Sequence, residues 1–396
     1  MSMDRFGDKV CCNPTVKLRR QESYPVIDID KITPGYKTVR SMESVEYTGQ
    51  GGAKFQNHDV LFARITPCLE NGKMAIADTE GQNGIGSTEL FVFRGINGVS
   101  DTDYVYYLLC MKHIRQLAAN SMTGASGRQR ADLDFIKRIQ WDFPDIETQK
   151  KISSALSVYD DLIEVNNKRI KTLEQMAENL YKEWFVRFRF PGHETAEFEN
   201  GIPKGWVYRR ADEVIDFNPT LKTGNQTEFT IIPMEALSTN SMVLDSSCFV
   251  QQDSISGRRS QNGDTLLAKI TPCLENGKTG FVMGMPENEV LGGSTEFVVM
   301  RSKALTPHYV YCIARSYYFR QIAILSMNGA DGRQRVDEEK LKSTKIVQPE
   351  KTVLDRFETI VTPIFDGVYQ MVQENKNLMK QRNLLLPRLM SGKLEV

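Results

Sequence analysis

Two long segments of the chain carry hydrophobic residues at alternating spacings of four and three, the repeat of a coiled-coil seam. They cover residues 144–188 and 349–390, and each predicts one long helix. The first seam consists of Ile152, Leu156, Tyr159, Ile163, Asn166, Ile170, Leu173, Ala177, Leu180 and Trp184. The second consists of Phe357, Val361, Ile364, Val368, Met371, Asn375, Leu378, Leu385 and Leu389, with Arg382 interrupting the series. Two seams of matching length bury each other most economically, and the order domain–helix–domain–helix favours an antiparallel pair with a globular domain at each end.

Three details of these seams lead to local expectations. Pro363 cannot continue a smooth helix, so a new helix is expected to begin there with proline in its first turn. Residues 166–168 align better with 374–376, at a shift of 208, which would insert three residues into the second seam and overwind it locally. Asn166 and Asn375 are either buried polar residues that set the register or residues at an exposed edge of the seam, and the pattern leaves both open.

The remainder of the chain mixes short β-branched runs with turn residues. Residues 60–65 and 89–94 are predicted to be strands, and residues 103–120 a helix. The expected fold class is α+β: two similar globular α/β domains separated by a pair of long helices that form an antiparallel coiled coil. The expected boundaries are 1–143 for the first domain, 144–188 for a central helical spacer, 189–348 for a linker and the second domain, and 349–396 for a C-terminal helical spacer.

One internal repeat relates the two halves of the chain. The run DVLFARITPCLENGK at 59–73 returns as DTLLAKITPCLENGK at 264–278, a shift of 205 residues. The same shift relates 13–15 to 218–220, 104–106 to 309–311, 115–118 to 320–323 and 121–130 to 326–335. The run GSTE at 86–89 returns at 293–296, so a two-residue insertion lies between. Chance does not produce so many matches in one register, and a pseudo-twofold repeat follows.

Charge and composition narrow the function classes only slightly. Lys+Arg and Asp+Glu both number 50 in 396 residues, which argues against a generic basic coat but leaves room for local basic patches. The seven cysteines form no C-x-x-C pair, and no apolar N-terminal region or run of 18 apolar residues occurs. A soluble cytoplasmic protein without a membrane segment is expected.

Several motifs resemble catalytic or cofactor sites but lack their chemistry. The run GKT at 277–279 has Pro272 where a phosphate-binding loop needs glycine, and the first copy has Met74 where it needs a hydroxyl. The glycine-rich run 81–86 leads into a strand rather than a helix N-terminus. Residues 145–147 suit the first turn of a helix better than a nuclease site. No His, Cys or carboxylate group has metal-ligand spacing. We expect no catalytic residue, no metal and no cofactor bound by this chain.

Two repeated segments are candidates for contact with double-stranded DNA. The first is the basic glycine loop with Arg128, Gln129 and Arg130, repeated as Arg333, Gln334 and Arg335. Arginine pairs bidentately with guanine or phosphate, and glutamine with adenine; the alternative is a solvated loop with internal salt bridges. The second is the proline turn with Arg64, Thr66 and Lys73, repeated as Lys269, Thr271 and Lys278, which is either a phosphate-backbone contact or a purely structural turn.

With both halves considered, the chain resembles the specificity subunits of type I restriction–modification systems. The segments that carry the resemblance are 177–188, 201–206 and 383–393, which look like the central and C-terminal conserved regions of that family. The resemblance implies two target-recognition domains, each reading one half of a split DNA site, and a helix pair that sets the unread gap. It also implies assembly with two modification subunits, which bind S-adenosylmethionine, and with restriction subunits that cleave.

Two other classes of function compete with this interpretation. A stand-alone DNA-modifying enzyme would need a cofactor or metal constellation, which the sequence lacks. A DNA-independent protein-interaction scaffold built on the helix pair would leave the repeated Arg-Gln-Arg loops unexplained. A non-catalytic DNA-recognition subunit is therefore the expected function.

Overall fold

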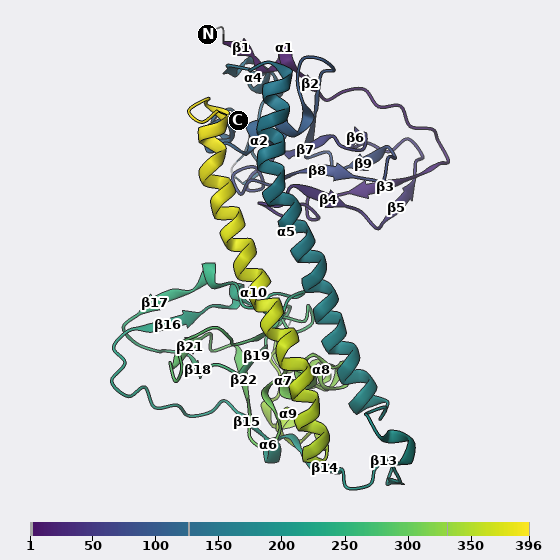
Figure 1. Ribbon diagram of the computed structural model, residues 1–396, viewed down its shortest axis with the longest axis vertical. Helices are drawn as coiled ribbons and strands as arrows, with labels where there is room; N and C mark the ends of the chain where they lie inside the picture. Colours follow the sequence, from purple (N-terminus) through teal and green to yellow (C-terminus); the bar gives the residue numbers. More distant parts are fainter. Residues whose placement is uncertain (1–2, 126, 331, 396) are drawn as a thin grey trace. The chain divides into compact units, whose positions relative to one another are not determined.

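The computed structural model describes residues 3–125, 127–330 and 332–395 and divides the chain into two compact units (Figure 1). Unit 1 comprises Met1–Glu164 with Asn375–Val396, and unit 2 comprises Val165–Glu374. Both long helices, α5 (Ile146–Tyr181) and α10 (Lys351–Met390), contribute residues to both units. The fold is mixed α/β with two long helices, as expected for its class.

Unit 1 contains two small sheets. The larger has the strand order β2 (Val10–Cys12), β10 (Leu90–Gly95), β7 (Val60–Ala63), β8 (Met74–Asp78) and β4 (Thr38–Arg40). The other has the order β5 (Ser44–Glu46), β3 (Ser23–Ile27), β9 (Gly84–Gly86) and β6 (Ala53–Phe55). The short strands β1 (Asp4–Arg5) and β11 (Gln140–Trp141) pair separately, and the short helices are α1 (Phe6–Lys9) and α4 (Leu133–Arg138). The strands expected at 60–65 and 89–94 are therefore present, with slightly shifted ends.

The helix expected over 103–120 is instead two helices, α2 (Thr102–Cys110) and α3 (Lys112–Asn120). Met111 has an extended backbone, with φ −63° and ψ 128°, and ends one helix where the other begins. The break redirects α3 so that Ile114 and Ala118 enter the core that also receives the buried residues 104–109 of α2. Tertiary burial therefore outweighs the local preference for one continuous helix.

Unit 2 repeats this arrangement. Its first sheet has the order β15 (Ile215–Phe217), β22 (Phe297–Ser302), β19 (Thr265–Ala268) and β20 (Thr279–Phe281), which matches β2-β10-β7-β8 of unit 1. Its second sheet has the order β17 (Val250–Gln252), β16 (Phe229–Ile232), β21 (Leu291–Gly293) and β18 (Arg258–Ser260). The strands β14 (Val207–Arg210) and β23 (Lys345–Gln348) form a separate pair. The sequence repeat is thus a repeat of tertiary structure.

The helices of unit 2 follow the same plan. They are α6 (Ala211–Val214), α7 (Pro307–Arg315), α8 (Tyr317–Leu325) and α9 (Glu338–Ser343), with short helical turns η2 (His193–Thr195), η3 (Met234–Ala236) and η4 (Ser246–Cys248). The hairpin β12 (Phe198–Glu199) and β13 (Ile202–Pro203) precedes them.

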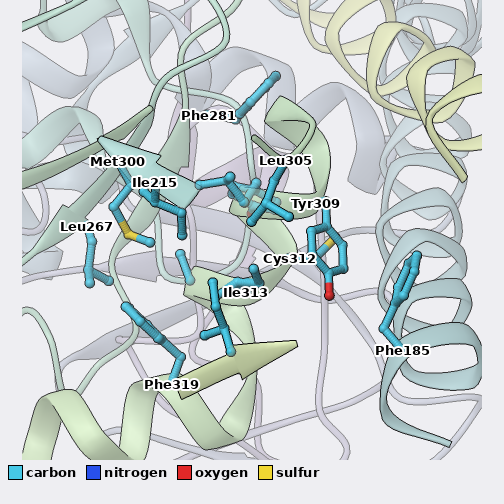
Figure 2. Close-up of a cluster of buried hydrophobic side chains, with 14 of the residues drawn as sticks. Phe185, Ile215, Leu267, Phe281, Met300, Leu305, Tyr309, Cys312, Ile313 and Phe319 are labelled. Atoms are coloured by element: carbon cyan, nitrogen blue, oxygen red, sulfur yellow. The ribbon is translucent and has the colours of Figure 1, made fainter. Parts of the chain in front are cut away.

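The core of unit 2 joins α7 to the end of α5. Figure 2 shows Tyr309 of α7 beside Phe185, which belongs to η1 (Lys182–Val186), a π-helical turn that follows α5. The rings of Phe185 and Tyr309 lie 4.5 Å apart in an edge-to-face contact. The long helix is therefore anchored in this unit by aromatic packing, which is stronger than burial of the same area alone.

Within unit 2 the two long helices pair in antiparallel fashion. The Asn166 amide donates to Glu374 at 2.9 Å, and the ring of Phe185 lies 4.9 Å from that of Phe357. Partners that advance along α5 recede along α10, which defines the antiparallel direction. Asn166 and Asn375 are both only 5% exposed, so they lie inside the seam and the alternative of an exposed edge is wrong.

Two expectations for the second helix are corrected. α10 continues through Pro363, which lies on its exposed side, because the buried neighbours Phe357, Val361 and Phe365 stabilise the helix by more than the proline costs. The 205-residue shift relates buried seam residues at both ends of the helices, so the expected three-residue insertion is absent. These pairs are Leu156 with Val361, Ala177 with Arg382, and Trp184 with Leu389.

Candidate nucleic-acid interface

The two candidate segments of each repeat lie against each other. In unit 1 the amide of Thr66 donates to the carbonyl of Gln129 at 3.0 Å, and the amide of Ala131 donates to Arg64 at 2.8 Å. In unit 2 the amide of Thr271 donates to Gln334 at 3.0 Å. Each proline turn after β7 or β19 therefore supports the glycine loop that was expected to contact DNA, and all three bonds join backbone atoms.

The last arginine of each glycine loop is held by a glutamate. Arg130 donates two hydrogen bonds to Glu89, at 2.8 Å from Nε and 2.5 Å from Nη2. Arg335 binds Glu296 in the same way, at 2.9 and 2.7 Å. The hydrogen bond from Arg130 lowers the pKa of Glu89, and that from Arg335 lowers the pKa of Glu296. Both glutamates end the repeated GSTE run, which sequence analysis did not connect with the loop.

The first arginine of each loop is exposed and is not held by a glutamate in the described residues. Arg128 follows Gly127, whose φ is +80°, and Arg333 follows Gly332, whose φ is +79°. This left-handed conformation suits glycine, and an added Cβ at either position would meet open space. Within the described residues, neither guanidinium has a hydrogen bond or ion pair. Gln129 and Gln334, beside them, are half-buried.

The basic side chains of the proline turns contact other residues of their own unit. Arg64 stacks over the ring of Phe91 at 4.8 Å, and its counterpart Lys269 pairs with Glu338 at 2.9 Å. Lys73 donates to the carbonyl of Ile29 at 2.9 Å, and Lys278 to that of Met234 at 3.1 Å.

The two threonines of these turns are half-buried, and each contacts an exposed glutamate of its own turn. The hydroxyls of Thr66 and Thr271 lie 3.4 and 3.5 Å from Glu70 and Glu275. Of the twelve candidate residues, Arg128 and Arg333 are therefore the two exposed arginines without a partner among the described residues.

Arginines of the following helices hold the proline turns, a role the sequence did not reveal. In unit 2 Arg315 donates to the carbonyl of Gly277 at 2.9 Å, and Arg320 to that of Glu275 at 3.2 Å. In unit 1 Arg115, the counterpart of Arg320, lies against Gly72. The only sequence signal was the repetition of Arg115-Gln as Arg320-Gln.

The described part of the chain contains neither a metal-binding cluster nor a membrane-spanning helix. In residues 3–125, 127–330 and 332–395, no cluster of three or more His, Cys, Asp or Glu side chains has the arrangement of a metal site. None of the helices in that part of the chain has the length and apolar character needed to cross a membrane.

Replacing Glu89 with glutamine is expected to loosen the 123–130 loop, because the charge-assisted contact to Arg130 is lost. The amides of Arg128 and Arg130, which donate to Ala125 and Thr123, should exchange hydrogen faster. Because the pKa of Glu89 is lowered in the folded state, its contribution to stability is present above the ordinary pKa of glutamate and is lost as the pH falls through the lowered value. Hydrogen exchange of this loop, with Glu43→Gln as an exposed control, measures the effect; equal exchange in both variants would contradict it.

Comparison with known proteins places these features in a family. The family described as "Type I restriction modification DNA specificity domain" matches residues 12–175. The MjaVIII specificity subunit of Methanocaldococcus jannaschii is 22% identical over 392 residues, covering 94% of this chain and 89% of that protein. The MjaIX specificity subunit of the same organism is 24% identical over 306 residues, covering 74% and 69%. The HindI specificity subunit of Haemophilus influenzae is 29% identical over 143 residues, covering 35% of this chain and 30% of that protein.

A solved structure shares the fold. The S subunit of the type I restriction–modification system from M. genitalium superposes with a TM-score of 0.51 at 13% identity, covering 98% of this chain and 95% of that one. At this identity the likeness shows the fold alone.

Proposed function

The chain belongs to the specificity subunits of type I restriction–modification systems, and from that premise we propose that each of its two units reads one half of a bipartite DNA site. Specificity subunits recognise DNA and are non-catalytic, and methylation and cleavage reside in partner subunits. A stand-alone enzyme is thereby excluded. The observation that carries the proposal is the duplicated loop with an exposed arginine that has no partner among the described residues, Arg128 in unit 1 and Arg333 in unit 2.

The loop geometry supports direct base readout. An exposed guanidinium can pair bidentately with the O6 and N7 atoms of guanine in the major groove, and an adjacent glutamine with the N6 and N7 atoms of adenine. Arg130 and Arg335 act as positioning residues in this proposal, because each is already bound to a glutamate. The turns with Arg64, Thr66 and Lys73, and with Lys269, Thr271 and Lys278, then support the reading loop, and a backbone contact to phosphate is their secondary role.

The two long helices complete the proposal as an antiparallel coiled-coil spacer. α5 and α10 contain 36 and 40 residues, and the spacer would set the number of unread base pairs between the half-sites. The proposed domain boundaries remain 1–143, 144–188, 189–348 and 349–396. Altering the length of the helices should then change the gap and leave both half-sites unchanged.

The partners follow from the family. We propose that the chain assembles with two modification subunits, that these bind S-adenosylmethionine and methylate adenine, and that restriction subunits join the full complex in the cytoplasm. Support comes from α5, which exposes Val158, Leu162 and Met176 by 56, 46 and 51%. Apolar side chains on the outer side of a helix suit a protein partner.

Methylation mapping in cells that express this chain with its modification subunit tests the proposal. A split motif with two short specific halves is expected, and its halves should be related in sequence because the reading loops are near-identical. A continuous motif, or loss of sequence preference, would contradict the bipartite reading. Two half-sites of unrelated sequence would contradict the expected similarity between the halves, but not the proposal that the site is bipartite.

A further inference from the structure

A buried ion pair lies in the part of the helical seam that belongs to unit 1. Asp160 of α5 and Arg382 of α10 are 5% and 6% exposed and form a salt bridge. The Tyr107 hydroxyl donates to the second oxygen of Asp160 at 2.5 Å, and Arg382 also donates to the carbonyl of Gly35 at 3.0 Å. Both charges are therefore compensated by a partner and by a further hydrogen bond, which a buried pair requires.

The matching positions of unit 2 carry no charge. The residue 205 positions after Asp160 is Phe365, which is fully buried, and the residue 205 positions before Arg382 is Ala177, which is 2% exposed. Both belong to the hydrophobic core of unit 2, where Phe365 packs 5.2 Å from the ring of Phe281. Cys312 takes the place of Tyr107. In unit 1 the helices are joined by an ion pair, whereas the matching positions of unit 2 hold an aromatic and a small side chain in one hydrophobic core.

This difference bears on which helices can pair. In a duplicated chain, the seam of α5 resembles that of α10, so α5 could also pair with the α5 of a second copy. Repeat symmetry would then place Asp160 against Ala177. In a pair of two α10 helices, Arg382 would face Phe365. Each of these two homodimeric helix pairs therefore contains two buried charges without a partner, one near each end of the pair.

We propose that the Asp160–Arg382 pair is a selectivity element that directs α5 to α10 and excludes the pairing of either helix with its own copy from a second chain. The remaining seam is mostly apolar in both repeats, so hydrophobic burial alone distinguishes these arrangements weakly. An unpaired buried charge disfavours a helix pair by more than about a hundredfold. The bond from Asn166 to Glu374 adds a smaller preference in the same direction. The proposal is independent of DNA reading.

The test starts from the folded full-length chain, which is then cut once by a protease. A protease site is placed at the exposed hairpin tip of Asn200 and Gly201, between β12 and β13. The cut protein is taken through mild denaturant and diluted back, and native mass spectrometry counts the three dimers of its two fragments. The wild-type fragments should form heterodimers, with homodimers below about 1%.

Each single substitution should release a different homodimer. Arg382→Ala recreates the Phe365–Ala pair between two C-terminal fragments, so C-terminal homodimers should rise to at least about a tenth of the population. Asp160→Phe recreates the same pair between two N-terminal fragments, so N-terminal homodimers should rise instead. If the Asp160–Arg382 pair had only a structural role, each substitution would weaken the heterodimer and both homodimers alike. The charge-swapped variant Asp160→Arg/Arg382→Asp should retain heterodimers.

Exposed neighbours on the same helices provide matched controls, Asp161→Phe on α5 and Arg388→Ala on α10. Both should leave the heterodimers unchanged. Exclusive heterodimers in both test variants, or the wrong homodimer in either, would overturn the proposal. Failure of the wild-type fragments to reassociate would also overturn it, because the pair would then be too weak to direct pairing.

Discussion

Alanine at both Arg128 and Arg333 is expected to weaken specific DNA binding by about 2–6 kcal/mol, from about 1–3 kcal/mol for each lost bidentate contact. Both guanidinium groups are exposed and unpaired in the described residues, so their removal breaks no internal contact. Folding should therefore be unaffected, and the loss should appear in DNA recognition alone. Each single variant should relax one half-site and leave the other intact.

Titration of the assembled complex with specific and non-specific duplexes measures this effect. Arg356→Ala removes one charge from an exposed position on α10, as each single variant does from its loop, and provides the control for the single variants. Equal weakening on both duplexes would show that the arginines contact phosphate rather than bases, since phosphate contacts carry no sequence information. Unchanged affinity on both would show that the loop is only solvated, and base readout by these residues would be rejected.

Phe357→Ala is expected to destabilise unit 2 by about 3–5 kcal/mol, the range for a fully buried phenylalanine. Phe357 is fully buried, and its ring lies 6.1 Å from Trp184, 4.9 Å from Phe185 and 6.2 Å from Tyr309. Truncation removes the ring that joins α10 to η1 and α7, and leaves a cavity between three elements.

The repeat offers a matched comparison in the other unit. Ile152, 205 residues earlier, is 4% exposed, and Ile152→Ala should destabilise unit 1 by about 2–5 kcal/mol. The tryptophans separate the two signals, because Trp141 belongs to unit 1 while Trp184 and Trp206 belong to unit 2. Denaturant unfolding with Trp141 replaced by phenylalanine reports unit 2 alone. An equal effect of both variants on that signal would show that the two units unfold as one.

Periodicity and repetition in the sequence were sufficient to predict much of this fold. The four–three spacing from Ile152 to Trp184 is satisfied only by a helix, so both long helical segments were predicted. Their details differ, because α5 ends at Tyr181 rather than at residue 188 and α10 continues through Pro363, where a new helix was expected to begin. The 205-residue repeat predicted two similar units, because near-identical segments with the same surroundings adopt the same structure. The two loops of each candidate interface were also found in this way.

Tertiary structure decided which of these side chains are free to act. Arg128 and Arg130 look alike in the sequence, and both are exposed, but Glu89, 41 positions away from Arg130, binds only the second of them in the described residues. Arg382 interrupts a hydrophobic seam when α10 is considered alone, yet it meets Asp160, 222 positions away, inside the fold. The partner of a side chain is set by contacts between positions far apart in the sequence, which form only in the folded chain. The burial of the two groups then determines how strong their interaction is. The helix through Pro363 continues for the same reason, because packing against distant residues outweighs a local preference.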